Sequence, residues 1–115
     1  MKIVSREVFL LLPSGTIYAR GKQWYFDSIC VKHDSLLNDW VYTNPSWVDA
    51  NDSGEADERL EDSLKTGASY PCEKDAGRDG RFDAEDIFMV FERDDLVWLR
   101  DQISAAISLC GAEES

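Results

Sequence analysis

The strongest constraint on the fold is the apolar run IFMVF at residues 87–91, which is bordered by Asp86 and Glu92. A run of five apolar residues has the length of a strand and is too short for a buried helix. Because apolar side chains occupy odd and even positions alike, the run predicts a central strand that is buried on both faces. The chain should therefore be built on a β-sheet.

Two further strands are predicted earlier in the chain. Residues 16–20 and 23–33 are rich in β-branched and aromatic side chains and are separated by two turn residues, which predicts an antiparallel hairpin. In the second strand the apolar positions change parity between Phe26 and Ile29. This change indicates a β-bulge at residues 27–28.

Three helices are predicted from residues typical of helix ends. The middle helix has a thin apolar stripe and an acidic remainder, whereas apolar residues in the last helix recur at three-four spacing. The helices run from the Ser5 cap to about Leu12, from the Asp52 cap to Thr66 with Gly67 as C-cap, and from the Asp94 cap to Gly111.

These elements predict an α+β fold with a mainly antiparallel sheet of four or five strands. Residues 38–43 supply a third strand before the apolar run, and residues 46–50 are a candidate for a fourth. With 115 residues the chain has room for one domain, which we place at residues 1–111. Residues 112–115 are expected to form a flexible C-terminal tail.

Negative charge is concentrated in the middle of the chain. The net charge is −11, and residues 49–95 alone hold 16 acidic against 6 basic residues. Such a block repels nucleic acid phosphates and anionic lipid and attracts basic proteins. We therefore expect a basic protein partner, such as a nucleic-acid-binding protein, and no direct binding of nucleic acid or membrane.

The acidic residues of the middle helix are the candidate partner-binding surface. Aromatic residues are numerous for one small core, so some rings should be exposed. Trp40 could belong to the core or to an interface, and Trp47 lies next to the acidic block. The predicted partner-binding residues are Glu55, Asp57, Glu58, Glu61, Asp62 and Trp47.

An alternative function is calcium binding by residues 75–86. Asp75, Asp79, Asp83 and Asp86 fall where the EF-hand loop places acidic ligands, and a glycine lies between them at the turn position. The loop departs from that pattern at Gly77, which offers no side-chain ligand, and at its last position, where Asp replaces the usual Glu. An acidic surface turn is the competing interpretation.

Catalytic and zinc-binding motifs are absent from the sequence. The three cysteines are widely spaced, and the chain has a single histidine, His33, so no zinc site is implied. We expect Cys30 and Cys110 to be buried as small apolar residues and Cys72 to be exposed. No nucleophile motif or phosphate-binding glycine loop accompanies the carboxylates, so we expect no enzymatic activity and no cofactor.

Three segments resemble a group of small acidic proteins encoded by bacteriophages and prophages. They are FLLLPSGT at residues 9–16, DANDSGE at residues 49–55 and GRDGRFD at residues 77–83. The resemblance implies an accessory protein that binds and modulates another protein. A more specific version of this hypothesis is that the protein mimics the charge pattern of DNA. It carries over no catalytic residue. Because no apolar run approaches the ~20 residues of a membrane span, we expect a protein of the bacterial cytoplasm.

Overall fold

The computed structural model describes residues 1–78, 80 and 83–114, with side chains as far as residue 111. Its class is α+β, as the sequence predicts. Within these residues the elements are β1 (Lys2–Ser5), α1 (Arg6–Leu10), β2 (Ile17–Lys22), β3 (Tyr25–Leu36), β4 (Asp39–Thr43), α2 (Ser53–Thr66), β5 (Gly77–Arg78), β6 (Ile87–Val90) and α3 (Arg93–Glu114).

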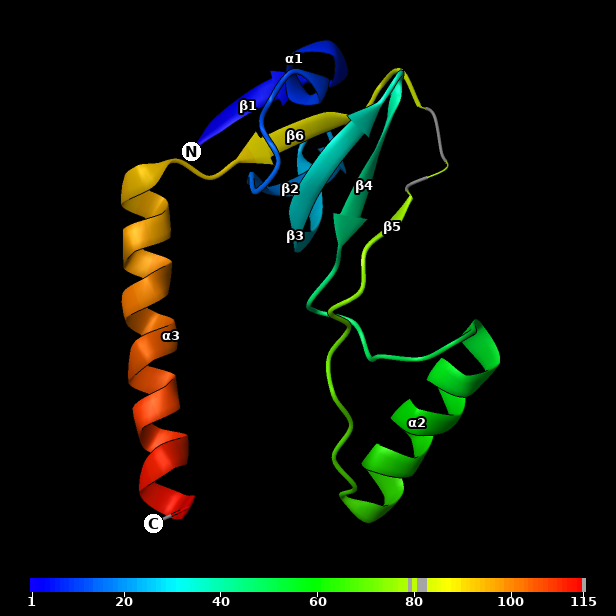
Figure 1. Cartoon of the computed structure of the whole chain (residues 1–115), viewed down its shortest axis with the longest axis vertical. Coiled ribbons are helices and arrows are strands. Elements are labelled where there is room, and N and C mark those ends of the chain that lie inside the picture. The colour runs from blue at the N-terminus through cyan, green and yellow to red at the C-terminus, as the bar shows by residue number, and fades with distance from the viewer. Residues whose placement is uncertain (79, 81–82, 115) are drawn as a thin grey trace.

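The six strands form one sheet in the order β1-β6-β2-β3-β4-β5, and every neighbouring pair is antiparallel (Figure 1). Strand β6 lies inside the sheet between β1 and β2, as its apolar run predicts. Its two faces differ, however. Phe88 and Val90 are buried, whereas Ile87 and Met89 are half-buried. The prediction of burial on both faces was wrong, because the structure places α1 and the aromatic core on only one side of this strand.

The core is a cluster of aromatic rings on one face of the sheet. Phe9 of α1 stacks on Phe88 with ring centroids 4.0 Å apart and meets the edge of Trp40 at 5.1 Å. The indole N–H of Trp40 donates a hydrogen bond of 2.8 Å to the hydroxyl of Tyr18. All four residues are at most 2% exposed. Trp40 is therefore a core residue, and the alternative of an interface role does not apply to it.

The predicted hairpin is β2 with β3, and its bulge is confirmed. Ala19 pairs with Ile29 and Gly21 with Phe26, so β3 holds one extra residue in the interval 27–28. The turn lies beyond Lys22, slightly later than the sequence indicated, because β2 continues through Gly21.

The sheet has more strands than predicted, and one candidate strand is not among them. Strands β1 and β5 were not anticipated, whereas residues 46–50 contribute only an isolated bridge between Val48 and Cys72. These residues instead belong to the first of two chain segments that connect the sheet to α2 (Figure 1).

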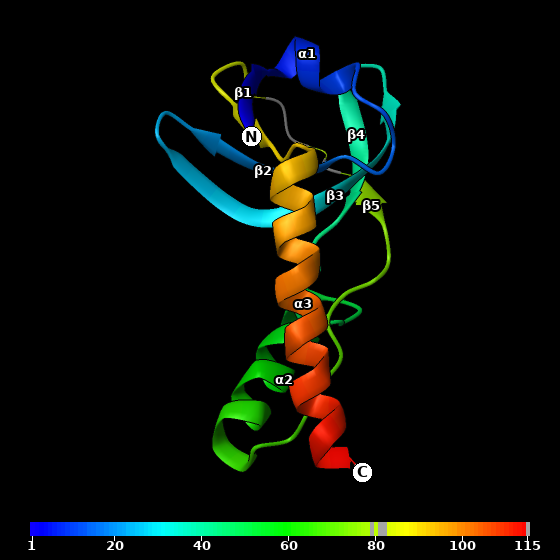
Figure 2. The same cartoon turned by 90° about the vertical axis from the view of Figure 1, so that its left-hand side faces the viewer.

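Helix α3 differs from its prediction at both ends and in its surroundings. It begins at Arg93, so Asp94 lies in the first turn and is not the cap, and it passes through Gly111 to Glu114. Residues 112–114 therefore continue the helix where we expected the tail to begin. Figure 2 shows α3 running away from the sheet. Cys110, predicted to be buried, is exposed, and Trp98 is 61% exposed.

Helix α3 is also the longest helix of the described chain. No helix within the described residues is long and apolar enough to cross a membrane.

Candidate functional site

The acidic helix α2 is fixed at both ends by the capping residues that the sequence indicates. The side chain of Asp52 accepts a hydrogen bond of 2.7 Å from the backbone N–H of Glu55. At the other end Gly67 adopts a left-handed conformation with φ of 78°, and its N–H donates to the carbonyl of Ser63. These caps satisfy backbone groups that a helix leaves unpaired, so α2 forms without extensive packing on the sheet.

One side of α2 is anchored to the connecting segments through Arg59. Its guanidinium donates to the backbone carbonyl of Asp49 at 2.6 Å and forms an ion pair of 3.0 Å with Glu55 one helical turn away. The same guanidinium lies over the ring of Tyr70, 5.3 Å from the centroid. Ala56 is buried on this side. Arg59 therefore fixes which side of the helix faces the protein.

Asp62 is also held by a contact within the protein. Its carboxylate accepts a hydrogen bond of 2.6 Å from the hydroxyl of Tyr70. This bond favours the protonated phenol and raises the pKa of Tyr70 above its ordinary value. Two of the five predicted α2 carboxylates, those of Glu55 and Asp62, are thus engaged within the protein.

The other three carboxylates are exposed. Asp57, Glu58 and Glu61 are exposed, whereas Glu55 and Asp62 are half-buried. Glu61 pairs with Lys65 at 2.9 Å, with both side chains about two-thirds exposed. Among the described contacts, Asp57 and Glu58 have no hydrogen bond or ion pair. We call Asp57, Glu58 and Glu61 the acidic face.

Trp47 lies apart from this face, on the segment that leads from β4 to α2. Its backbone N–H donates to the carbonyl of Asn44 at 3.3 Å, and its carbonyl accepts from the N–H of Glu73 at 2.8 Å. Its ring is 48% exposed. The described contacts thus tie Trp47 to the returning segment and not to the acidic face.

The residues of the predicted calcium loop have separate partners. Asp75 is exposed, Asp83 pairs with Lys22 at 2.5 Å, and Asp86 is buried against arginines. Asp79 lies outside the described residues. Within the described residues no three His, Cys, Asp or Glu side chains are grouped so that they could hold a metal ion. Calcium binding by this segment stays a prediction.

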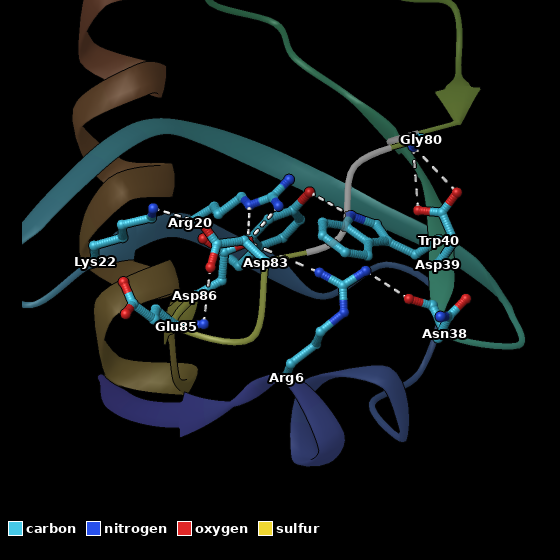
Figure 3. Close-up of polar contacts among 11 residues, drawn as sticks. Arg6, Arg20, Lys22, Asn38, Asp39, Trp40, Gly80, Asp83, Glu85 and Asp86 are labelled. Atoms are coloured by element: carbon cyan, nitrogen blue, oxygen red, sulfur yellow. Dashed lines mark hydrogen bonds and ion pairs between the residues drawn. The ribbon is translucent and has the colours of Figure 1, made fainter.

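Asp86 belongs instead to a buried ion network beneath the core (Figure 3). Arg20 donates to the Asp86 carboxylate through Nε at 2.7 Å and also through Nη2. Arg6 places Nη1 3.8 Å from the same carboxylate and donates through Nη2 to the carbonyl of Asn38 at 2.5 Å. Both guanidinium groups lie over the indole of Trp40, at 5.0 and 5.2 Å. The network joins α1, β2 and the segment before β6.

A second buried carboxylate holds the short strand β5 at the sheet edge. Asp39 accepts from Arg78 at 2.5 Å. It also accepts from the backbone N–H of Gly80 at 3.1 Å (Figure 3). Burial alone would raise the pKa of Asp39, but these hydrogen bonds and one from the N–H of Trp40 together hold it below its ordinary value. Asp39 therefore stays ionised in the fold.

A cavity of about 250 Å³ opens beside the network. Burial and, secondarily, the charges of Asp27 and Glu73 raise the pKa of the Cys30 thiol at its edge to about 11. The thiol is therefore protonated near neutral pH and a poor nucleophile, and His33 pairs with the hydroxyl of Thr43 at 2.9 Å rather than with Cys30. The cavity is lined by Tyr18, Arg20, Asp27, Ser28, Cys30, Trp40, Tyr42 and Asn44.

The ion network was missed at the sequence level. Arg20 and Asp86 are 66 residues apart, and the only motif that contains Asp86, the calcium-loop pattern, does not point to Arg20. The one available signal was the placement of Arg20 in a strand next to residues that proved to be buried.

A scan against protein-family models finds no matching family for this chain. Searches of curated proteins and of solved structures find no match either.

Proposed function

We propose that this protein is a non-enzymatic accessory protein that binds a basic protein through the acidic face of α2. The resemblance to phage and prophage proteins suggests the context, a partner in the host or phage proteome. The observation that carries the proposal is the arrangement of α2. One side is anchored by Arg59, while the acidic face is exposed, and two of its three carboxylates have no partner among the described residues.

The position of α2 supports this role. Figure 1 shows the helix set apart from the sheet on two connecting segments. A convex helix that projects from the body of a protein can enter a groove of a partner without contact between the two sheets. Exposed carboxylates there would speed encounter with a positively charged surface, with a strong dependence on salt.

The test compares two variants that lose the same charge. The first carries Asp57→Asn, Glu58→Gln and Glu61→Gln on the acidic face. The matched control carries Glu7→Gln, Asp34→Asn and Glu85→Gln at exposed sites elsewhere. Tagged proteins are used to capture partners from nuclease-treated bacterial lysate, with elution by a salt step.

We expect a basic protein that the wild type and the control retain and that the acidic-face variant loses. Retention by all three proteins, or equal loss from both variants, would refute a specific role for the acidic face. If the protein mimics DNA, duplex DNA should also displace the same partner from the wild-type protein in a competition experiment.

A further inference from the structure

Helix α3 has an apolar stripe that is exposed from Ile103 to Cys110, whereas Leu96 and Leu99 at its start are half-buried. Every residue from 100 to 111 is exposed, and Ile103 and Ile107 are 58% and 65% exposed. In Figure 1 the helix runs downward from the end of β6 and stays well apart from α2. The stripe consists of Leu96, Leu99, Ile103, Ala106, Ile107 and Cys110.

The spacing within this stripe is that of a coiled coil. Leu96, Leu99, Ile103, Ala106 and Cys110 are separated by three, four, three and four residues, which are the a and d positions of a heptad repeat. A helix that merely packs on a sheet needs no such strict alternation. Residues 102–112 also contain no charged side chain, so this part of α3 approaches a second copy without repulsion.

We propose that α3 pairs with α3 of a second copy of this chain in a parallel two-stranded coiled coil. The orientation follows from the charges beside the stripe. With Leu96 at position a, Asp95 is a g residue and Arg100 is the e residue of the same heptad. In a parallel pair the g residue of one helix faces the e residue five positions later on its partner. Asp95 and Arg100 are five positions apart, so the pairing forms twice, once on each side of the two-fold axis.

Antiparallel pairing does not use these charges. There e residues face e residues and g residues face g residues. In the register centred on the first heptad, Arg100 would face Arg100 of the other copy. The charge pattern thus favours the parallel arrangement.

Both groups can reach a second copy. Arg100 contacts its neighbour Asp101 at 3.3 Å with both side chains more than half exposed. Asp95 accepts from the N-terminal amine of Met1 and from the N–H of Glu92, in both cases through Oδ2. Among the described contacts its Oδ1 is therefore open to a guanidinium.

The size of the stripe sets the strength of the interaction. The stripe spans only about two heptads, from Leu96 to Cys110, which is short for a stable interface. We therefore expect a weak dimer. It forms independently of the acidic face, which lies on another helix.

Two adjacent alanines provide a matched test of the interface. Ala106 is a d residue in the stripe, whereas Ala105 is a c residue outside it, and both are exposed. Sedimentation equilibrium between about 5 and 500 µM protein should show a monomer–dimer equilibrium for the wild type. Ala106→Glu should raise the dissociation constant at least tenfold, and Ala105→Glu should change it less than twofold. Circular dichroism confirms that both variants keep their helix content. A wild type that stays monomeric to 500 µM, or equal effects of the two substitutions, would overturn the proposal.

A disulfide between the two Cys110 residues tests whether the α3 helices pair in parallel. In the parallel dimer the two Cys110 residues share one a layer, where their Cα atoms come within disulfide range. In a Cys72→Ser background, oxidation by diamide should convert two Cys110 thiols into one disulfide and produce a covalent dimer. The control chain carries Cys72→Ser, Cys110→Ser and Ala105→Cys, which moves the thiol to the outer side, and it should stay monomeric on denaturing gels. A sedimenting dimer that fails to cross-link through Cys110 would overturn the parallel arrangement.

Discussion

Removal of the Asp86 charge should be among the most damaging conservative substitutions in the protein. The side chains of Asp86, Arg6 and Arg20 are only 5%, 9% and 11% exposed. Asp86→Asn keeps the shape of the side chain but leaves two guanidinium groups over Trp40 without their carboxylate. Because water cannot replace that charge, breaking a buried pair of this kind costs about 3–5 kcal/mol. That is a large fraction of the ~5–15 kcal/mol of free energy of unfolding of a small domain.

Urea unfolding followed by tryptophan fluorescence measures this loss. With a slope of roughly 1.5–2 kcal/mol per molar urea, the midpoint of Asp86→Asn should fall by about 2 M. Asp83→Asn is the control, because Asp83 pairs with Lys22 at the surface, where the pair is solvated. Its midpoint should stay close to that of the wild type. Equal midpoints for the two variants would refute the conclusion that the buried network holds α1 to the sheet.

Three further predictions concern single residues. A Cβ on Gly21 would collide with the backbone carbonyl of Tyr25 and approach the Phe26 side chain to 2.8 Å, so Gly21→Ala should lower the melting temperature strongly. Gly77→Ala is the control and should not lower it, because there is open space around Gly77. Because Cys30 is neutral in the fold with a pKa of about 11, its contribution to the free energy of unfolding should be constant below pH 9 and fall as the pH rises toward 11. Cys30→Ala should reduce the alkaline fall in urea titrations; an unchanged fall would contradict the assignment. Loss of the α2 cap in Asp52→Ala should cost about 1 kcal/mol of stability and reduce helical circular dichroism; an effect no larger than that of Ser53→Ala would argue against the cap.

Local signals in the sequence predicted the local structure. Ser5, Asp52 and Gly67 are found at the helix ends that their chemistry favours, because a cap depends on residues three or four positions away. The bulge in β3 was readable from the change of parity between Phe26 and Ile29. These features are determined by interactions within one helical turn or between two adjacent strands.

Features that depend on distant partners were not readable. Strand β1 exists because it pairs with β6, more than 80 residues away, and β5 is two residues long and depends on β4. The carboxylate of Asp86 was interpreted as a surface ligand since nothing nearby in the sequence marks Arg20 as its partner.

The stripe of α3 shows the limit of hydrophobic periodicity. Its three-four spacing correctly predicted a helix but was read as burial within the chain. Periodicity fixes which residues share a side and says nothing of what covers them. Cys110 was therefore assigned to the core and is exposed.

The sequence shows that negative charge is concentrated on α2, but it does not show which of the carboxylates bind within the protein and which are exposed. Five carboxylates on one short helix could all have faced solvent. Arg59 and Tyr70 decide the matter, because they bind Glu55 and Asp62, whereas Asp57, Glu58 and Glu61 are exposed.

The segment that carries α2 begins and ends at neighbouring strands of the sheet. Residues 44–76 leave the sheet at the end of β4 and return at β5, and these two strands are direct neighbours, with Tyr42 opposite Gly77. The excursion is thus a module inserted between adjacent strands. The entropy of closing such a loop grows only with the logarithm of its length, and its backbone contacts lie mostly within itself. The length and sequence of this module can therefore be changed with little effect on the sheet.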